Sequence, residues 1–247
     1  MAFFIFKILQ QMYNLIKSNC TFVKFILKQF NPTYNLKTLD KNEKEHLTPE
    51  MALQILKNGN ERFVNNLEAD RNLLEQVNAT RDGQSPFAII LSCIDSRTSA
   101  ELIFDQGLGD IFSVRIAGNV INTDVIGSME YACKLANSKL IVVLGHTKCG
   151  AIKGACDFVE LGSLTELLTK IQPAVYAEKT TPTELRNSKN LQFVNNVSAI
   201  NVKKSVQAIL DRSYILEQMV ASGAIGIVGG MYDIETGKVD FYEDIHH

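Results

Sequence analysis

A chain of 247 residues, 46% of them hydrophobic, is long enough to bury one sizeable core. A formal net charge of −2, with no tryptophan and no basic stripe, argues against nucleic acid as a partner. The five cysteines are an odd number in a chain too long to need disulfide staples, so they favour metal binding and a reducing, cytoplasmic compartment over a disulfide framework.

The first 39 residues differ in composition from the rest of the chain. They contain five lysines and no Asp or Glu, and lysine interrupts every apolar stretch. None of these stretches approaches the roughly 20 residues needed to span a bilayer, so no stable membrane insertion is expected. We expect residues 1–46 to form an N-terminal helical extension and linker that packs on a neighbouring subunit. Weak binding to a membrane surface, and export or organellar targeting through this extension, are the alternatives.

Residues 47–247 are expected to form one domain in which strands alternate with helices. Thr48-Pro49-Glu50 places an N-cap, a first-turn proline and an acid at the start of a helix that runs to about Leu67. Apolar runs predict buried strands at 86–91, 111–116, 140–145 and 224–229. Helices are expected at 99–104, 124–135, 151–161 and 197–221, and irregular helices at 163–189.

The turn at Thr236-Gly237 leads into an expected antiparallel edge strand at 238–242. The alternation of strands and helices predicts an α/β fold with a mostly parallel sheet. In full, we expect four parallel core strands plus the antiparallel edge strand, flanked by helices, with the helical extension at the N-terminus.

Two short segments contain the residues that could bind a metal ion. Residues 93–97 (CIDSR) follow the first expected core strand, and residues 146–150 (HTKCG) follow the third. Because ligands bind outside the carboxyl ends of the strands in open α/β sheets, the two segments should meet there. Two cysteines and one histidine, with a fourth position left open, are a typical catalytic zinc set. The predicted ligands of one zinc ion per chain are Cys93, His146 and Cys149, with water or Asp95 as the fourth.

With these segments the chain resembles the β-class carbonic anhydrases. The resemblance runs from about Leu47 to Asp244 and includes residues 100–107 (AELIFDQG), 114–119 (VRIAGN) and 145–150 (GHTKCG). It implies zinc-dependent, reversible hydration of carbon dioxide to bicarbonate and a proton, by attack of zinc-bound hydroxide. It also implies a homodimer or homotetramer.

Asp95 and Arg97 are the catalytic residues that the resemblance implies. A free carboxylate beside a dication can compete with water for the metal, and Arg97 offers Asp95 a bidentate alternative partner. In the family, the matching Asp orients the zinc-bound hydroxide through a hydrogen bond; in some members it binds zinc instead and closes the site.

The resemblance implies four substrate-binding residues as well. Gln84 matches a glutamine that contacts substrate in the plant-type branch of the family, and Gly150 matches a glycine whose backbone N–H lies beside the substrate. Phe112 and Tyr131 match aromatic positions of the same pocket, which in that branch borrows residues from a neighbouring subunit.

Another branch of the family has an inhibitory bicarbonate pocket. This chain keeps Arg115 and Tyr232 at two of its positions but has Thr98 in place of a Val and Ile90 in place of a Trp. These departures predict that bicarbonate does not inhibit the protein cooperatively.

Two other functions are compatible with the same residues. Hydrolysis of CS₂ or COS would use the same metal ligands, and access to the pocket would decide between these substrates and CO₂. A non-catalytic, zinc-stabilised binding or redox-sensing protein would use Cys93 and Cys149 structurally. The Asp95–Arg97 pair argues against this last function, because a closed structural site does not need an oriented carboxylate.

Overall fold

The computed structural model describes residues 46–242, and the structural statements below concern these residues. The expected N-terminal extension therefore lies, except for His46, outside the described residues.

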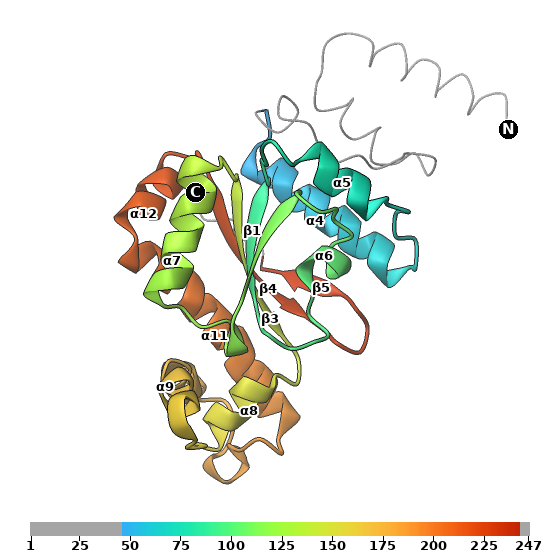
Figure 1. Ribbon diagram of the computed structural model, residues 1–247. Helices are drawn as coiled ribbons and strands as arrows, with labels where there is room; N and C mark the ends of the chain where they lie inside the picture. Colours follow the sequence, from blue (N-terminus) through green and yellow to red (C-terminus); the bar gives the residue numbers. More distant parts are fainter. Residues whose placement is uncertain (1–45, 243–247) are drawn as a thin grey trace, which may run out of the picture. The chain divides into compact units, whose positions relative to one another are not determined.

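A five-stranded sheet in the order β2-β1-β3-β4-β5 forms the centre of the described part of the chain (Figure 1). Adjacent strands from β2 to β4 pair in parallel, and β5 pairs antiparallel to β4. The expected fold class is thereby confirmed. The apolar runs at β1, β3 and β4 became strands that are buried on both faces, as is usual in parallel sheets, whereas β2 at the sheet edge is only partly buried. The strands are β1 (Ala88–Ser92), β2 (Ile111–Arg115), β3 (Leu140–His146), β4 (Gly226–Tyr232) and β5 (Val239–Phe241).

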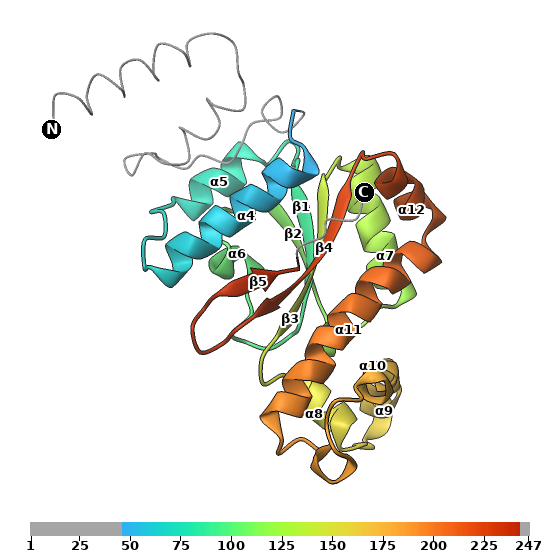
Figure 2. The ribbon, with the colours of Figure 1, turned by 180° about the vertical axis from the view of Figure 1, so that it is seen from behind.

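Helices cover both faces of this sheet. Figures 1 and 2 show α4 (Pro49–Val64), α5 (Leu73–Ala79) and α6 (Ala100–Ile103) on one side. On the other side lie α7 (Thr123–Glu130), α11 (Leu191–Arg212) and α12 (Tyr214–Ala221).

Two strand glycines let α11 pack closely on β3 and β4. A Cβ added at Gly145 or Gly229 would lie 2.6 or 2.7 Å from a methyl group of Val202 on α11. No real Cβ tolerates such a distance, so the helix would have to move away from the sheet. Any side chain on α11 that reaches the end of β3 depends on this close approach.

Short helices gather beyond the carboxyl end of β3, at the bottom of Figure 1. They are α8 (Gly150–Cys156), α9 (Gly162–Thr169) and α10 (Gln172–Ala177). Single turns complete the described chain at Ala117–Asn119, Tyr131–Leu135 and Thr183–Leu185.

The helices of the structure differ from the expected helices in two places. The helix expected at 197–221 is two helices, because Ser213 adopts an extended backbone between them. Its hydroxyl accepts a hydrogen bond from the Leu216 N–H and donates one to Glu130, so the break is stabilised locally. Helix α5 was not expected, since its large apolar residues are exposed and produce no burial pattern.

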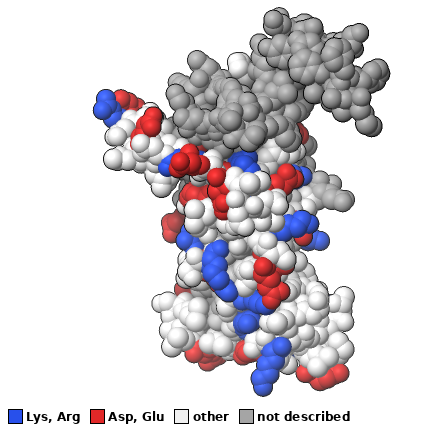
Figure 3. Space-filling view, turned by 90° about the vertical axis from the view of Figure 1, so that its right-hand side faces the viewer, with Lys and Arg blue, Asp and Glu red and all other residues white. Residues whose placement is uncertain are grey.

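No helix of the described part of the chain is long and apolar enough to cross a membrane. On the face shown in Figure 3, basic and acidic side chains are interspersed. That face therefore presents no broad surface of a single sign.

Candidate metal centre

Three potential metal ligands meet at the carboxyl ends of two adjacent strands. Cys93 follows β1, His146 is the last residue of β3, and Cys149 is the N-cap residue of α8. Because β1 and β3 are parallel neighbours, their ends bring the two sequence segments together. The ligand atoms of all three side chains lie within 4.8 Å of one another, and the two sulfur atoms are 3.8 Å apart.

The imidazole of His146 is oriented with one nitrogen towards the sulfur atoms. Nδ1 lies 3.0 Å from the carbonyl oxygen of Thr147, which can accept its hydrogen. Nε2 then carries a lone pair, and this buried atom has no hydrogen-bond partner among the described residues. An imidazole whose other nitrogen is fixed by a carbonyl is the usual arrangement of a metal-binding histidine.

The two thiols are electrostatically coupled. A hydrogen bond with Cys149 is the largest cause that lowers the pKa of Cys93, to about 4, and the Gly118 N–H contributes to the same shift from 3.3 Å. The pKa of Cys149 is raised, first by its hydrogen bond with Cys93 and then by burial. One thiolate therefore opposes the ionisation of the other. A cation between them removes this conflict, because it stabilises both thiolates.

This donor set fits a metal ion such as zinc. Two buried thiols and a buried imidazole nitrogen without a partner match the sulfur and nitrogen ligands that zinc takes in proteins. The carboxylate of Asp95, expected as an alternative fourth ligand, is not part of the group of atoms within 4.8 Å.

Asp95 is instead paired with Arg97 on the loop after β1. Arg97 donates from Nε to Oδ1 at 2.9 Å and from Nη2 to Oδ2 at 2.7 Å. These hydrogen bonds hold the pKa of Asp95 well below its usual range. The carboxylate is therefore charged throughout the neutral pH range and has a fixed orientation.

Two further side chains hold this loop by its carbonyl oxygens. Arg115, at the end of β2, donates to the carbonyl oxygens of Cys93 and Asp95 at 3.1 and 2.6 Å. The buried hydroxyl of Thr98 lies 3.0 and 2.9 Å from the same two oxygens. The contacts of Arg115 could not be inferred from sequence spacing, because β2 reaches the loop only through the sheet.

A pocket of about 280 Å³ opens beside the candidate ligands. Cys93 and Asp95 form one wall, and Gly150, at the start of α8, lies on its lining. Leu164 and Leu168 of α9 contribute apolar surface. The sequence predicted only irregular helices in this region, so nothing in it identified the two leucines as pocket residues.

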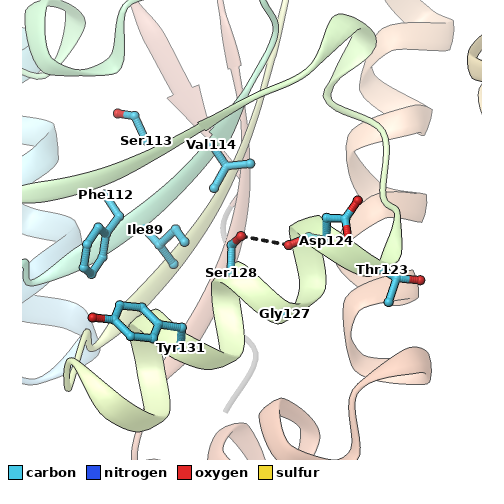
Figure 4. Close-up of a pocket in the computed structure, with 9 residues that line it drawn as sticks. All are labelled: Ile89, Phe112, Ser113, Val114, Thr123, Asp124, Gly127, Ser128 and Tyr131. Atoms are coloured by element: carbon cyan, nitrogen blue, oxygen red, sulfur yellow. Dashed lines mark hydrogen bonds between the residues drawn. The ribbon is translucent and has the colours of Figure 1, made fainter.

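The other three expected substrate residues do not line this pocket. Phe112 and Tyr131 line a separate groove of about 720 Å³ between the β2 edge of the sheet and α7 (Figure 4). Their rings meet edge to face with centroids 6.2 Å apart. Gln84 is exposed in the segment before β1 and lines neither pocket.

The chain is similar to known proteins. The family model described as carbonic anhydrase matches residues 88–239. Carbonic anhydrase 2 of Mycobacterium tuberculosis is 38% identical over 196 residues, covering 77% of this chain and 91% of its own. The carbonic anhydrase of Mycolicibacterium smegmatis is 37% identical over 195 residues, covering 78% and 92%.

Solved structures agree with the sequence comparison. The β-carbonic anhydrase CafA of Aspergillus fumigatus superposes with a TM-score of 0.60 at 28% identity, covering 69% of this chain and 81% of its own. A tetrameric β-carbonic anhydrase of Sordaria macrospora shares the fold, with a TM-score of 0.62 at 23% identity over 69% of this chain and 87% of its own. The fold and the family place the chain among α/β enzymes, with a candidate metal centre at the strand ends. The chain belongs to the carbonic anhydrase family, in its β class.

Proposed function

We propose that the protein catalyses the reversible hydration of carbon dioxide to bicarbonate and a proton, with one zinc ion per chain. The observation that supports this most directly is the presence of two features at the carboxyl end of β1, where Cys93 and Asp95 line the same pocket. Two buried thiols and an imidazole nitrogen without a partner lie beside a carboxylate that an arginine fixes in place. Family membership supports the same reaction.

Cys93, His146 and Cys149 would hold the zinc ion. When bound, zinc supplies a Lewis acid that makes a water molecule nucleophilic near neutral pH. The chain itself supplies two thiolates, which balance the charge of the ion, and a histidine whose Nδ1 is committed to the carbonyl of Thr147. These contacts fix the ligands before the substrate arrives.

Asp95 is proposed to accept the hydrogen bond of the attacking water. It lines the pocket, it is ionised, and its orientation is set by Arg97. Its place as a fourth metal ligand is less well supported, since both of its oxygens already accept hydrogen bonds from Arg97. Catalysis then needs both Asp95 and Arg97, because Arg97 fixes the orientation of the Asp95 carboxylate.

The pocket is suited to a small, apolar substrate. Leu164 and Leu168 present apolar surface, and a Cβ at Gly150 would meet no atom within 4 Å, so this glycine leaves its part of the pocket open. Carbon dioxide has no net dipole, and such a lining can accept it without strong polar contacts.

We also propose a homodimer, or a tetramer built from it, in which the partner completes the pocket. Gln84, Phe112 and Tyr131 are not brought to the pocket within one chain, although the family's pocket uses residues of these types. Tyr131 is 53% exposed and lies beside the unpaired edge of β2, a surface that a second copy can cover. Changing Tyr131→Asp should lower the mass measured by light scattering and the activity together. An unchanged mass with unchanged activity would refute this interface.

The four cysteines that the structure describes are free thiols, which supports a reducing compartment such as the cytoplasm.

The reaction itself is tested by stopped-flow hydration of CO₂ in a pH-indicator assay, with hydrolysis of COS and CS₂ measured on the same preparation. We expect CO₂ to be the preferred substrate. Faster turnover of COS or CS₂, with no CO₂ hydration above the buffer rate, would assign the pocket to the alternative hydrolysis.

A further inference from the structure

One peptide unit lies between two of the candidate metal ligands and is hydrogen-bonded at both of its ends. The carbonyl oxygen of Thr147 lies 3.0 Å from Nδ1 of His146. The N–H of the same peptide unit, which belongs to Lys148, donates to Oδ1 of Asn195 at 3.1 Å. Because a peptide unit is planar, a contact that fixes its N–H also fixes the direction of its carbonyl.

Helix α11 brings Asn195 to this peptide unit. Ser198, three residues further along the helix and therefore on the same face, donates from its hydroxyl to the carbonyl oxygen of His146 at 3.2 Å. The absence of a side chain at Gly145 is what lets α11 approach so closely, since a Cβ there would lie 3.3 Å from the Ser198 hydroxyl and 2.6 Å from Val202. One face of α11 thus contacts this peptide unit and the one that precedes it.

The backbone of Lys148 needs such support. Its φ is +58°, in the left-handed region that a residue with a Cβ rarely adopts without a compensating contact. On the opposite side, the backbone N–H of Thr147 donates to the carbonyl oxygen of Tyr232 at 3.0 Å. The hydroxyl of Thr147 accepts a hydrogen bond from the N–H of Ile234 at 3.1 Å and lies 3.3 Å from a carboxylate oxygen of Asp233. The loop between the ligands is therefore held between α11 and the end of β4.

We propose that Asn195 is a positioning residue for the metal centre. Through the peptide unit between Thr147 and Lys148, it aims a carbonyl at Nδ1 of His146. That carbonyl keeps the hydrogen on Nδ1 and leaves the lone pair of Nε2 facing Cys93 and Cys149. The inference rests on the proposed metal site and adds to it a residue that contacts neither metal nor substrate.

The first readout is the affinity for zinc, measured by competition with a chromophoric chelator. Asn195→Leu keeps the approximate volume of the side chain and removes the acceptor. Loss of a partner that orients a metal ligand typically weakens metal binding by about 10–100-fold, and we expect a change of that size. Asn195→Asp retains an acceptor oxygen and should restore most of the affinity.

Asn196 offers a matched control on the next position of the same helix. Its side chain donates to Glu178 at 3.3 Å and accepts from Gln192 at 2.8 Å, and within the described residues it forms no hydrogen bond with residues 147–149. Asn196→Leu should affect thermal stability while leaving the zinc affinity at the wild-type value. If Asn195→Leu does not fold, as judged by circular dichroism, Asn195→Ala repeats the test with a smaller side chain.

The second readout is the Nδ1–H of His146 in protein labelled with ¹⁵N at histidine. The chain has only four histidines, and His146 is 1% exposed, so its ring N–H should exchange slowly with water. In the zinc-loaded protein we expect this signal to exchange faster in Asn195→Leu and to be unchanged in Asn196→Leu. A structural role for Asn195 elsewhere in the fold would not alter this signal.

The outcomes separate the inference from the proposed function. If the wild-type protein binds no zinc, the proposed function is wrong. If the wild type binds zinc and Asn195→Leu binds it with the same affinity and the same exchange of the His146 N–H, the positioning role is wrong and the metal site stands. Equal weakening in Asn195→Leu and Asn196→Leu would likewise overturn the role, since it would reflect a general effect on α11.

Discussion

Arg97 holds the carboxylate of Asp95 by both oxygens, at 2.9 and 2.7 Å, and Asp95 lines the same pocket as the candidate metal ligand Cys93. The arginine is 54% exposed at its side chain, whereas the Asp95 side chain is 16% exposed. An ion pair whose arginine is this exposed contributes little to stability, because solvent screens it. The pair is therefore better explained by what it does to the orientation and charge of Asp95 than by what it adds to the fold.

Asp95→Asn should abolish most of the activity and leave the metal in place. The amide keeps the shape of the side chain but loses its negative charge and one acceptor oxygen. We expect kcat/KM to fall by at least about 10²-fold, as for the loss of a positioned acid–base group. Zinc content, measured by atomic absorption on the same sample, should stay at one per chain.

Asp240→Asn is the matched control for this change. Asp240 also forms an ion pair, with Lys238, but it lies on β5 and lines neither pocket. Its loss should leave kcat/KM unchanged. Near-normal activity of Asp95→Asn, or an equal fall in both variants, would contradict the role of Asp95.

Filling the pocket at Gly150 should impair the reaction in proportion to side-chain size. A Cβ at this position meets no atom within 4 Å, and its φ is not positive, so Ala and Val can be introduced without backbone strain. We expect a small loss of kcat/KM for Gly150→Ala and a loss of about 10–100-fold for Gly150→Val, the scale on which misplaced substrates react more slowly. Full activity of Gly150→Val at full zinc content would place the substrate elsewhere.

The sequence predicted the metal centre better than the pocket around it. Cys93 and His146 follow apolar runs, and the parallel pairing of those runs is enough to bring the two residues together. Asn195 reaches the site because α11 approaches the sheet at Gly145, and Leu164 reaches the pocket because α9 packs against α8. Both are tertiary contacts with no local signal in the sequence. The break at Ser213 was missed because the apolar pattern continues across it.

Bicarbonate should inhibit the enzyme without cooperativity. The Arg115 guanidinium, a candidate anion ligand, donates to the carbonyl oxygens of Cys93 and Asp95. Thr98 and Ile90, which replace two residues of the inhibitory pocket, are 1% and 0% exposed. Initial rates measured against bicarbonate concentration should give a Hill coefficient near one. A coefficient well above one that Arg115→Ala abolishes would reveal a functional inhibitory site.

Acid should destabilise the region around Glu178. Burial alone would raise the pKa of this 2% exposed carboxyl, but hydrogen bonds from Thr180, Thr181 and Asn196 outweigh it and leave the pKa lowered. Arg186 pairs with the same carboxylate at 2.9 Å. A lowered pKa in the folded state stabilises the protein above the unfolded-state pKa of about 4.3, and this contribution is lost as the pH falls through the lower, folded-state value.

Glu178→Gln removes that dependence. We expect its free energy of unfolding at pH 7 to be about 3 kcal/mol lower than that of the wild type, the lower end of the range for breaking a buried pair. In this variant Arg186 still donates hydrogen bonds to the carbonyl oxygens of Val175 and Glu178, which limits the loss of stability. Urea unfolding between pH 7 and pH 3 should show a shallower decline for the variant than for the wild type. Parallel declines would assign the acid sensitivity to other groups.

Removal and return of the metal test the central claim most directly. Zinc is stripped with a chelator under reducing conditions, and CO₂ hydration is measured by stopped flow as zinc is added back. The proposed function predicts no activity in the stripped protein and recovery that saturates at one zinc per chain, with no recovery in Cys149→Ala. Activity that survives stripping, or that Cys149→Ala regains with zinc, would contradict a catalytic metal held by Cys93, His146 and Cys149.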